Sequence, residues 1–390
     1  MVATLGGGLA RSRARSSGRA RCARHRDPRP ARRPRRRDNT GTRVPSTAGG
    51  GEEKVLKKLE EVESSLERAR ENLENLDKVD ALERRLLLLG KVAGLIKAAS
   101  AALGTYFLGS YLDVMPTVVR QLISLALAIA IAVRGHRKGS LAPSGSIAAL
   151  VVGWATFAHS FSFGVVLLFF FFSSSFLTKL KQDEKEKVEK DFKKNGQRDW
   201  IQVLANGGVP TAIALALTFL SVSPAQGAFM RGAFLGYYAC CCGDTWSSEI
   251  GVLSPRDPVL ITTLRTVRRG TNGGVSSWGL LASVLGGTSI GASYYVASLA
   301  SRDPSVSAAP TAILLCCLAG LVGSLVDSLL GATLQFSGVE EDTMKISNRP
   351  GKGIVRISGL QFLNNDAVNF VSAAVMAALT GTAFLITRTM

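Results

Sequence analysis

Long apolar runs separated by polar connections dominate the chain from about residue 90 onward. A helix that spans a bilayer needs roughly 17–25 mostly apolar residues. Runs of this kind cover residues 117–133, 161–177, 203–222, 225–242, 277–300, 310–331 and 367–386. Residues 146–158 form a shorter run, and residues 92–112 form the weakest one because it contains Lys97. The pattern predicts an all-α, polytopic membrane helix bundle of eight or nine spans over residues 90–390.

The connections between these runs alternate in character. Short, nearly uncharged turns lie at residues 159–160, 223–226 and 301–309, and long charged loops lie at 134–144, 179–202, 243–276 and 332–366. Because consecutive spans cross in opposite directions, the alternation places all four charged loops on one side. Their Lys and Arg residues predict the cytosolic side, or the equivalent stromal or matrix side. Within them, residues 179–194 mix both signs of charge, which predicts a solvated helix with intrahelical ion pairs.

A heptad stripe precedes the apolar part of the chain. Apolar residues step by four and three through Val55, Leu59, Val62, Leu66, Ala69, Leu73 and Leu76. This spacing predicts an amphipathic coiled-coil helix over residues 52–89, as an N-terminal element beside the membrane bundle. Two uses are open for it. Residues 52–80 join copies of the chain into a homo-oligomer, or the helix packs on its own membrane domain.

The strongly basic character of the protein comes mostly from its first 50 residues. They contain 14 Arg, no Lys and two acids, Asp27 and Asp38, so this stretch carries +12 of the net charge of +18. The composition predicts either an organelle transit peptide or a disordered tail. Since the charge belongs to the tail rather than to a folded domain, we expect no nucleic-acid partner.

Four acidic residues lie at the edges of the apolar runs or inside them. Asp244 and Glu249 follow the run that ends near Gly243, Asp327 lies within a run, and Asp366 opens the last one. Carboxylates removed from water are costly unless they are paired or metal-bound. A turn or helix start near Gly243 would make Asp244 either a helix N-cap or a magnesium ligand. We predict that these four acids hold one or two Mg²⁺, with Asp244, Glu249 and Asp327 as catalytic residues.

A basic cluster stands beside a glycine-rich turn about twenty residues further on. Arg265, Arg268 and Arg269 precede the turn, which consists of Gly270, Thr271, Asn272, Gly273 and Gly274. Arginine forms bidentate contacts with phosphate, and consecutive amides in a glycine turn can form an anion-binding nest. The combination predicts binding of nucleotide phosphates. Anchoring to anionic lipid is the alternative for such a cluster.

Two further polar segments open apolar runs. Asn364 and Asn365 precede the last run and are predicted either to bind phosphate or to cap the helix. The second segment, Asn206-Gly-Gly-Val-Pro210, follows Arg198 and interrupts an apolar run. It predicts either a broken helix that marks a site or a simple kink.

Several of these motifs, in this order, resemble the transmembrane protein nineteen family. The resemblance rests on residues 138–141, 243–251, 260–263, 270–275, 329–335 and 364–369, and it covers roughly residues 115–390. The plastid branch of that family includes phytyl-phosphate kinase, and a plant branch is described as a plasma-membrane regulator of sugar response. The segment Gly-Asp-Thr is also similar, more distantly, to CTP-using dolichol kinases and CDP-diacylglycerol synthases.

The resemblance and the site residues together imply an integral membrane, CTP-dependent, kinase-like enzyme. It would phosphorylate a phytyl or polyprenyl phosphate on the cytosolic or stromal face, with CTP as phosphate donor and Mg²⁺ as cofactor. The bilayer would be the plastid envelope or the plasma membrane or endomembranes. A non-enzymatic membrane regulator of sugar response, or a transporter, is the alternative that the same residues allow.

Overall fold

The computed structural model describes residues 57–58, 61–68, 71–72, 111, 115–188, 190, 196–301 and 309–389. The chain divides into two compact units, Met1–Leu86 and Leu87–Met390. In the first unit, the described residues between 57 and 72 are helical and exposed. The Arg-rich tail, the weakest predicted span and most of the predicted coiled coil lie outside the described residues.

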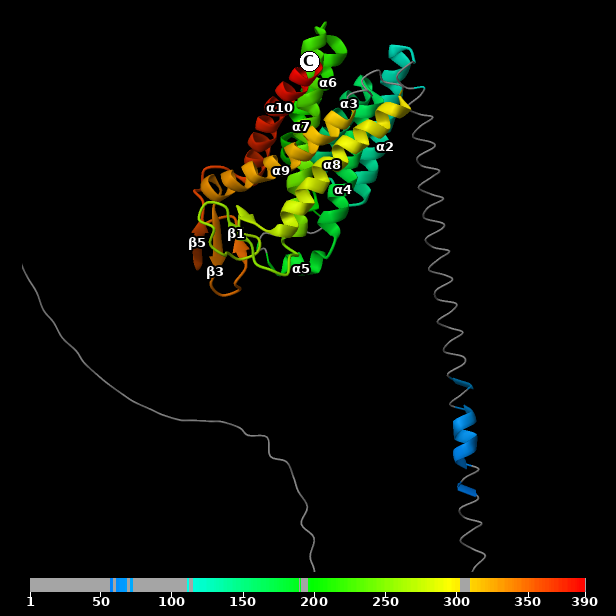
Figure 1. Ribbon diagram of the computed structural model, residues 1–390, viewed down its shortest axis with the longest axis vertical. Helices are drawn as coiled ribbons and strands as arrows, with labels where there is room; N and C mark the ends of the chain where they lie inside the picture. The colour runs from blue at the N-terminus through cyan, green and yellow to red at the C-terminus, as the bar shows by residue number, and fades with distance from the viewer. Residues whose placement is uncertain are drawn as a thin grey trace, which may run out of the picture. The chain divides into compact units, whose positions relative to one another are not determined.

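The second unit is a bundle of long helices (Figure 1). They are α2 (Thr117–Arg137), α3 (Pro143–His159), α4 (Phe161–Lys179), α6 (Trp200–Phe219), α7 (Pro224–Gly251), α8 (Ser277–Ala300), α9 (Ala309–Leu334) and α10 (Asn365–Thr389). Among the described residues, six helices are long and apolar enough to cross a membrane: α2, α4, α6, α8, α9 and α10. The prediction of a multi-pass helical membrane protein is confirmed, whereas eight or nine spans are not.

Two helices of the bundle explain the smaller number of spans. Helix α3 has 17 residues, which is short for a crossing. Helix α7 has 28 residues, but Arg231, Asp244 and Glu249 interrupt its apolar sequence. Both helices pack within the bundle. The apolar runs therefore predicted where these helices lie, while a crossing by α3 or α7 stays a prediction.

Five short strands lie in the long connections, which the all-α prediction did not include. They are β1 (Val259–Leu260), β2 (Gly274–Val275), β3 (Ser337–Glu340), β4 (Ile346–Ser347) and β5 (Ile354–Ser358). Strands β1 and β2 pair antiparallel, and β3 pairs antiparallel with β4 and β5 on its two sides. Pairing satisfies the backbone N–H and C=O groups of the connecting segments themselves. Figure 1 shows β1, β3, β5 and the short helix α5 (Gln182–Glu186) at one end of the bundle, away from the C-terminus.

The four charged connections contact one another at this end. The hydrogen bonds that join them run from Lys179 Nζ to Ser140 Oγ (3.1 Å), from Lys190 N to Ile346 O (2.9 Å) and from Asn272 N to Ser337 Oγ (2.9 Å). The alternation of charged and uncharged connections therefore placed the polar segments on the same face, as the sequence predicted.

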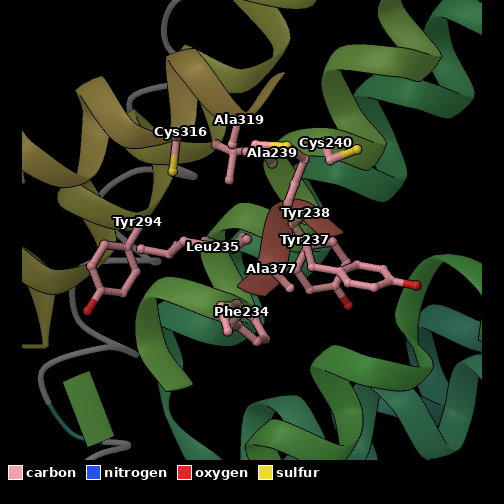
Figure 2. Packing of buried hydrophobic residues seen from close by; sticks show 14 of the residues in the cluster. Phe234, Leu235, Tyr237, Tyr238, Ala239, Cys240, Tyr294, Cys316, Ala319 and Ala377 are labelled. Atoms are coloured by element: carbon pink, nitrogen blue, oxygen red, sulfur yellow. The ribbon is translucent and has the colours of Figure 1, made fainter. Parts of the chain in front are cut away.

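Helix α7 lies at the centre of the bundle, in contact with α4, α6, α8, α9 and α10. Its Phe234, Tyr237 and Tyr238 are fully buried, and Figure 2 shows them within the central cluster of apolar side chains. The Phe234 ring stacks on Phe163 of α4 with 3.7 Å between centroids. Because lipid offers helices no hydrophobic drive to associate, packing contacts of this kind hold membrane bundles together.

Helix α7 continues through Gly243, so the predicted turn or helix start at that residue is wrong. A Cβ atom on Gly243 would lie 2.7 Å from Gly320 Cα of α9, so the glycine allows the two backbones to touch. Small residues in membrane bundles commonly serve this close approach. Asp244 is consequently an interior residue of a helix and not an N-cap.

Helix α6 is also continuous through the segment for which the sequence predicted either a break or a kink, so the break is wrong and the kink stays a prediction. Pro210 lies inside the helix and cannot donate to the carbonyl of Asn206 four residues earlier. The Cys241 thiol of α7 lies 3.9 Å from that carbonyl, and Thr211 Oγ1 donates to Gly207 O at 2.7 Å. Neighbouring side chains thus compensate for the proline, so no gap opens in the helix.

Candidate functional site

A polar cavity of about 420 Å³ lies where α7, α9 and α10 meet the charged connections. The predicted site residues that line it are Asp244, Glu249, Arg269, Gly270, Thr271, Asn272, Gly273, Gly274, Asp327, Asn365 and Asp366. The remaining three, Arg265, Arg268 and Asn364, do not line it. Residues from four separate segments therefore meet in one cavity, although whether they act there stays a prediction.

Asp244 of α7 and Asp327 of α9 form the acidic centre of the cavity. They are close enough to interact electrostatically. Ser324 Oγ donates to Asp244 Oδ1 at 3.2 Å, and Ser372 Oγ donates to Asp327 Oδ2 at 2.9 Å. The amide of Asn369, oriented to donate, lies 3.2 Å from the same Asp327 oxygen. Hydroxyl and amide donors thus orient two carboxylates that would otherwise repel each other.

The donor set fits a magnesium ion only in part. Across the described residues, no three acidic, histidine or cysteine side chains form a group that could hold a metal ion. Magnesium, however, is usually held by one or two carboxylates together with waters and substrate phosphates. Asp244 and Asp327 meet that requirement. Glu249 and Asp366 line the same cavity without forming such a group with the central pair.

Glu249 has a partner that the sequence did not reveal. Its Oε2 lies 2.6 Å from Nζ of Lys185, whose side chain is 3% exposed. The same ammonium group donates to Leu177 O at 2.6 Å and Thr178 O at 3.3 Å, at the end of α4. The predicted solvated helix over residues 179–194 is therefore wrong for Lys185. Within a stretch of mixed charge, no local signal indicates which lysine becomes buried.

Arg198 is a second cavity residue that the sequence analysis did not assign to the site. Its side chain is buried, and Nη1 donates to Ser175 Oγ at 2.7 Å. Burial lowers the pKa of Arg198 to about 10 against an opposing attraction from Glu249, so the guanidinium stays charged at neutral pH. Its backbone bonds to Ser140 O (3.1 Å) and Ala142 N (2.9 Å). The segment at residues 138–141 thus holds a buried cation in place.

In the glycine-rich turn, three backbone amides of the predicted anion-binding nest have partners within the protein, and one side-chain hydroxyl has none among the described residues. The amides of Thr271, Asn272 and Gly274 donate to acceptors within the protein at 2.9–3.2 Å. Those three N–H groups are therefore engaged already. By contrast, the buried Thr271 Oγ1 has no hydrogen-bond partner among the described residues, and Thr271 lines the cavity. Buried hydroxyls are normally paired, which makes this one a candidate donor to a bound ligand.

The three predicted arginines differ in position. Arg269 lines the cavity, with Nε 3.1 Å from Asp257 Oδ1. Arg268 is exposed and donates from Nη1 to Met344 O at 3.0 Å. Arg265 is also exposed. The structure thus brings one of the three to the cavity, and sequence spacing alone could not separate them.

The two asparagines at the start of α10 also differ. Asn364 Oδ1 accepts a hydrogen bond from Ala367 N at 2.9 Å, as the capping alternative predicted. Asn365 lines the cavity. Of the two interpretations offered for this pair, capping describes Asn364, while phosphate binding by Asn365 stays a prediction.

Substitution of Gly273 tests how tightly the turn is seated on α9. Gly273→Ala is expected to lower the apparent melting temperature more than Gly353→Ala, because both glycines have positive φ values but their surroundings differ. A Cβ atom on Gly273 would lie 2.6 Å from Ser328 O, whereas one on Gly353 would meet nothing within 4 Å. The left-handed backbone strain of about 1 kcal/mol is common to both variants. Equal melting temperatures in detergent would contradict the close contact between the turn and α9.

Comparison with known proteins agrees with this architecture. The model of the family described as integral membrane protein DUF92 matches residues 126–377. Protein PGR of Arabidopsis thaliana is 41% identical over 276 residues, which are 68% of this chain and 96% of that protein. Uncharacterized membrane protein MJ0933 of Methanocaldococcus jannaschii is 30% identical over 231 residues, 58% of this chain and 88% of that protein.

A third relative is chloroplastic by name. Protein VTE6, chloroplastic, of Arabidopsis thaliana is 31% identical over 232 residues, which are 57% of this chain and 66% of that protein. No solved structure matches the chain. The residues matched by the family model, 126–377, lie within the helical bundle and include those that line the polar cavity.

Proposed function

This chain belongs to the integral membrane protein family DUF92, and on that premise we propose that it is a CTP-dependent kinase of a phytyl or polyprenyl monophosphate. One observation carries the proposal. Two carboxylates from α7 and α9 line the same cavity as a buried arginine and a glycine-rich turn with an unpaired hydroxyl. The resemblance to a family that includes phytyl-phosphate kinase supplies the substrate class.

The reaction needs positioning more than a strong base. An oxygen of the substrate phosphate attacks the γ-phosphorus of CTP, the bond to the β-phosphate oxygen breaks, and CDP leaves. The acceptor oxygen is already charged at neutral pH, so no residue has to remove a proton from it. Phosphoryl transfer of this kind depends on alignment and on compensation of negative charge.

The residues of the cavity divide these tasks. Asp244 and Asp327 would hold Mg²⁺, which when bound neutralises charge on the nucleotide phosphates. Arg198 and Arg269 supply guanidinium groups that suit phosphate oxygens. Thr271 Oγ1 donates a further hydrogen bond. On this proposal the reacting groups lie at the end of the bundle whose Lys and Arg residues predict the cytosolic or stromal side.

A non-enzymatic membrane regulator, or a transporter, is the second candidate. Two observations favour it: the described residues contain no three-ligand metal group, and Glu249 is already paired with Lys185. The resemblance also includes a regulator of sugar response. On this alternative, the polar residues serve packing or a solute path.

A binding and transfer measurement separates the two. We expect purified protein in lipid nanodiscs to bind CTP only with Mg²⁺ and to transfer labelled γ-phosphate from CTP to phytyl phosphate. In the second arm of the experiment, binding of ATP, of phytyl phosphate and of farnesyl phosphate is measured separately. If neither nucleotide nor either isoprenoid phosphate binds, the kinase proposal is wrong and the regulator is favoured.

A further inference from the structure

A second cavity lies inside the bundle, among α2, α3, α4, α6 and α7. It has a volume of about 60 Å³, and its lining is almost entirely apolar. Among its lining residues are Ala128 of α2, Ala149 and Val152 of α3, Leu168 of α4 and Val203 of α6. None of the predicted site residues lines it. The functional assignments above therefore leave this cavity unexplained.

The apolar cavity adjoins the polar one. Four residues line both: Phe170, Arg198, Gln202 and Asn206. One buried arginine and two amide side chains thus stand between a space that suits hydrocarbon and a space that suits phosphate. A molecule with one apolar and one anionic end could contact both cavities at once.

We propose that the apolar cavity binds the phosphate-proximal part of a single hydrocarbon chain whose phosphate lies at Arg198. The inference rests on the proposed kinase function for the identity of the ligand as an isoprenoid monophosphate. It adds the place where the hydrocarbon lies and the residue that joins the two cavities. It also implies that the protein binds lipids with one chain and excludes lipids with two.

Arg198 has the properties that this junction requires. Among the described residues, its guanidinium donates a single hydrogen bond, to Ser175 Oγ, out of five N–H donors. Its backbone is fixed by Ser140 and Ala142, so little ordering is needed when a ligand binds. Burial strengthens its attraction to a phosphate because water screens the pair less.

The size of the cavity limits the ligand to one chain. An apolar protein cavity that admits benzene has a volume of roughly 150 Å³, so a space of about 60 Å³ holds only the first few carbon atoms of one chain and not two acyl chains. The rest of a long isoprenoid would extend beyond α2 into lipid. That helix presents an apolar surface outward, on which Val118, Leu122 and Ile129 are exposed.

The cavity also contains a hydroxyl with which a ligand could form a hydrogen bond. Tyr238 lines it and is fully buried, and its hydroxyl has no hydrogen-bond partner within the described part of the chain. The neighbouring Tyr237 hydroxyl, by contrast, donates to Ala205 O at 2.5 Å. An ester oxygen at the phosphate end of the ligand would give Tyr238 an acceptor.

Photolabelling with a matched pair of variants tests the proposal. The probe is hexadecyl phosphate with a diazirine near its phosphate end, added to purified protein in nanodiscs, with labelled residues located by mass spectrometry. We expect labels on α3, α4 and α6 around the cavity. Phytyl phosphate should compete with the probe, and dipalmitoyl phosphatidic acid should not.

Two neighbouring alanines of α3 provide the variants. Ala149→Leu fills the cavity and should lower labelling about tenfold or more, whereas Ala148→Leu adds the same volume at a residue that does not line it. The extent of labelling of Ala148→Leu should equal that of the unchanged protein. If Ala149→Leu does not give a monodisperse protein, Ala149→Val makes the same comparison with less added volume.

The outcomes separate this inference from the kinase proposal. Phosphate transfer with labels outside the cavity, or with equal labelling of Ala149→Leu and Ala148→Leu, overturns the inference and leaves the kinase in place. Labels in the cavity that Ala149→Leu removes, in a protein without transferase activity, support the binding site and overturn the kinase. Competition by phosphatidic acid as strong as by phytyl phosphate also overturns the single-chain inference.

Discussion

Asp244→Asn is expected to lower the rate of phosphate transfer from CTP to phytyl phosphate by about 100-fold or more. The amide keeps the shape of the carboxylate and can still accept the hydrogen bond from Ser324. It removes the negative charge that a cation at this site requires, and loss of one such electrostatic contact costs on the order of 100-fold or more in rate. Initial rates in nanodiscs, with labelled CTP, measure the effect.

Asp342→Asn is the matched control for this variant. Asp342 is exposed in the connection between β3 and β4 and does not line the polar cavity. It loses the same charge by the same chemical change, so its rate should equal that of the unchanged protein. Unaltered turnover in Asp244→Asn, with Asp342→Asn as reference, would exclude Asp244 from the reaction.

Glu249→Gln is expected to destabilise the protein strongly, by about 3 kcal/mol, because it leaves the Lys185 ammonium buried without a carboxylate. Two backbone carbonyls remain as partners of Lys185, but they carry no full charge. The double variant Lys185→Met/Glu249→Leu removes both charges and should regain most of the lost stability. Apparent melting temperatures, at fixed protein and detergent concentrations, measure both changes.

The same pair of variants separates two roles of Glu249. If Glu249 serves only the ion pair, the double variant should be stable and transfer phosphate at a rate close to that of the unchanged protein. If Glu249 also binds metal, as the sequence predicted, the double variant should be stable but inactive. A double variant no more stable than Glu249→Gln would contradict the ion-pair explanation.

The sequence predicted the helical bundle and the meeting of its charged connections because both depend on patterns within the chain. Apolar runs have the length of membrane helices. The alternation of charged and uncharged loops predicts on which side of the membrane each loop lies, and this needs no knowledge of how the helices pack. The acids of α7, α9 and α10 were recognised as unusual because carboxylates beside or within apolar runs are costly. Their presence in one cavity required the fold itself.

The errors arose where a local signal has two physical meanings. Gly243 predicts a turn or helix start nearby, but in the structure it allows contact with Gly320, which lies far along the chain. Arg198 and Lys185 each stand among other polar residues, and only tertiary contacts with Ser140 and Glu249 distinguish them. The short strands likewise depend on partners that no local pattern reveals.

The contact between Gly243 and Gly320 fixes the distance between α7 and α9 at the level of the acidic pair. With no side chain between α7 and α9, the main chains themselves set the separation of Asp244 from Ser324 and Asp327. Substitutions on the outer faces of the same helices are expected to leave the distance between these two main chains unchanged. A methyl group on Gly243 would meet Gly320 of α9, and one on Gly320 would lie 2.6 Å from Ser283 O of α8, so at either glycine an added side chain would push α9 away from a neighbouring helix.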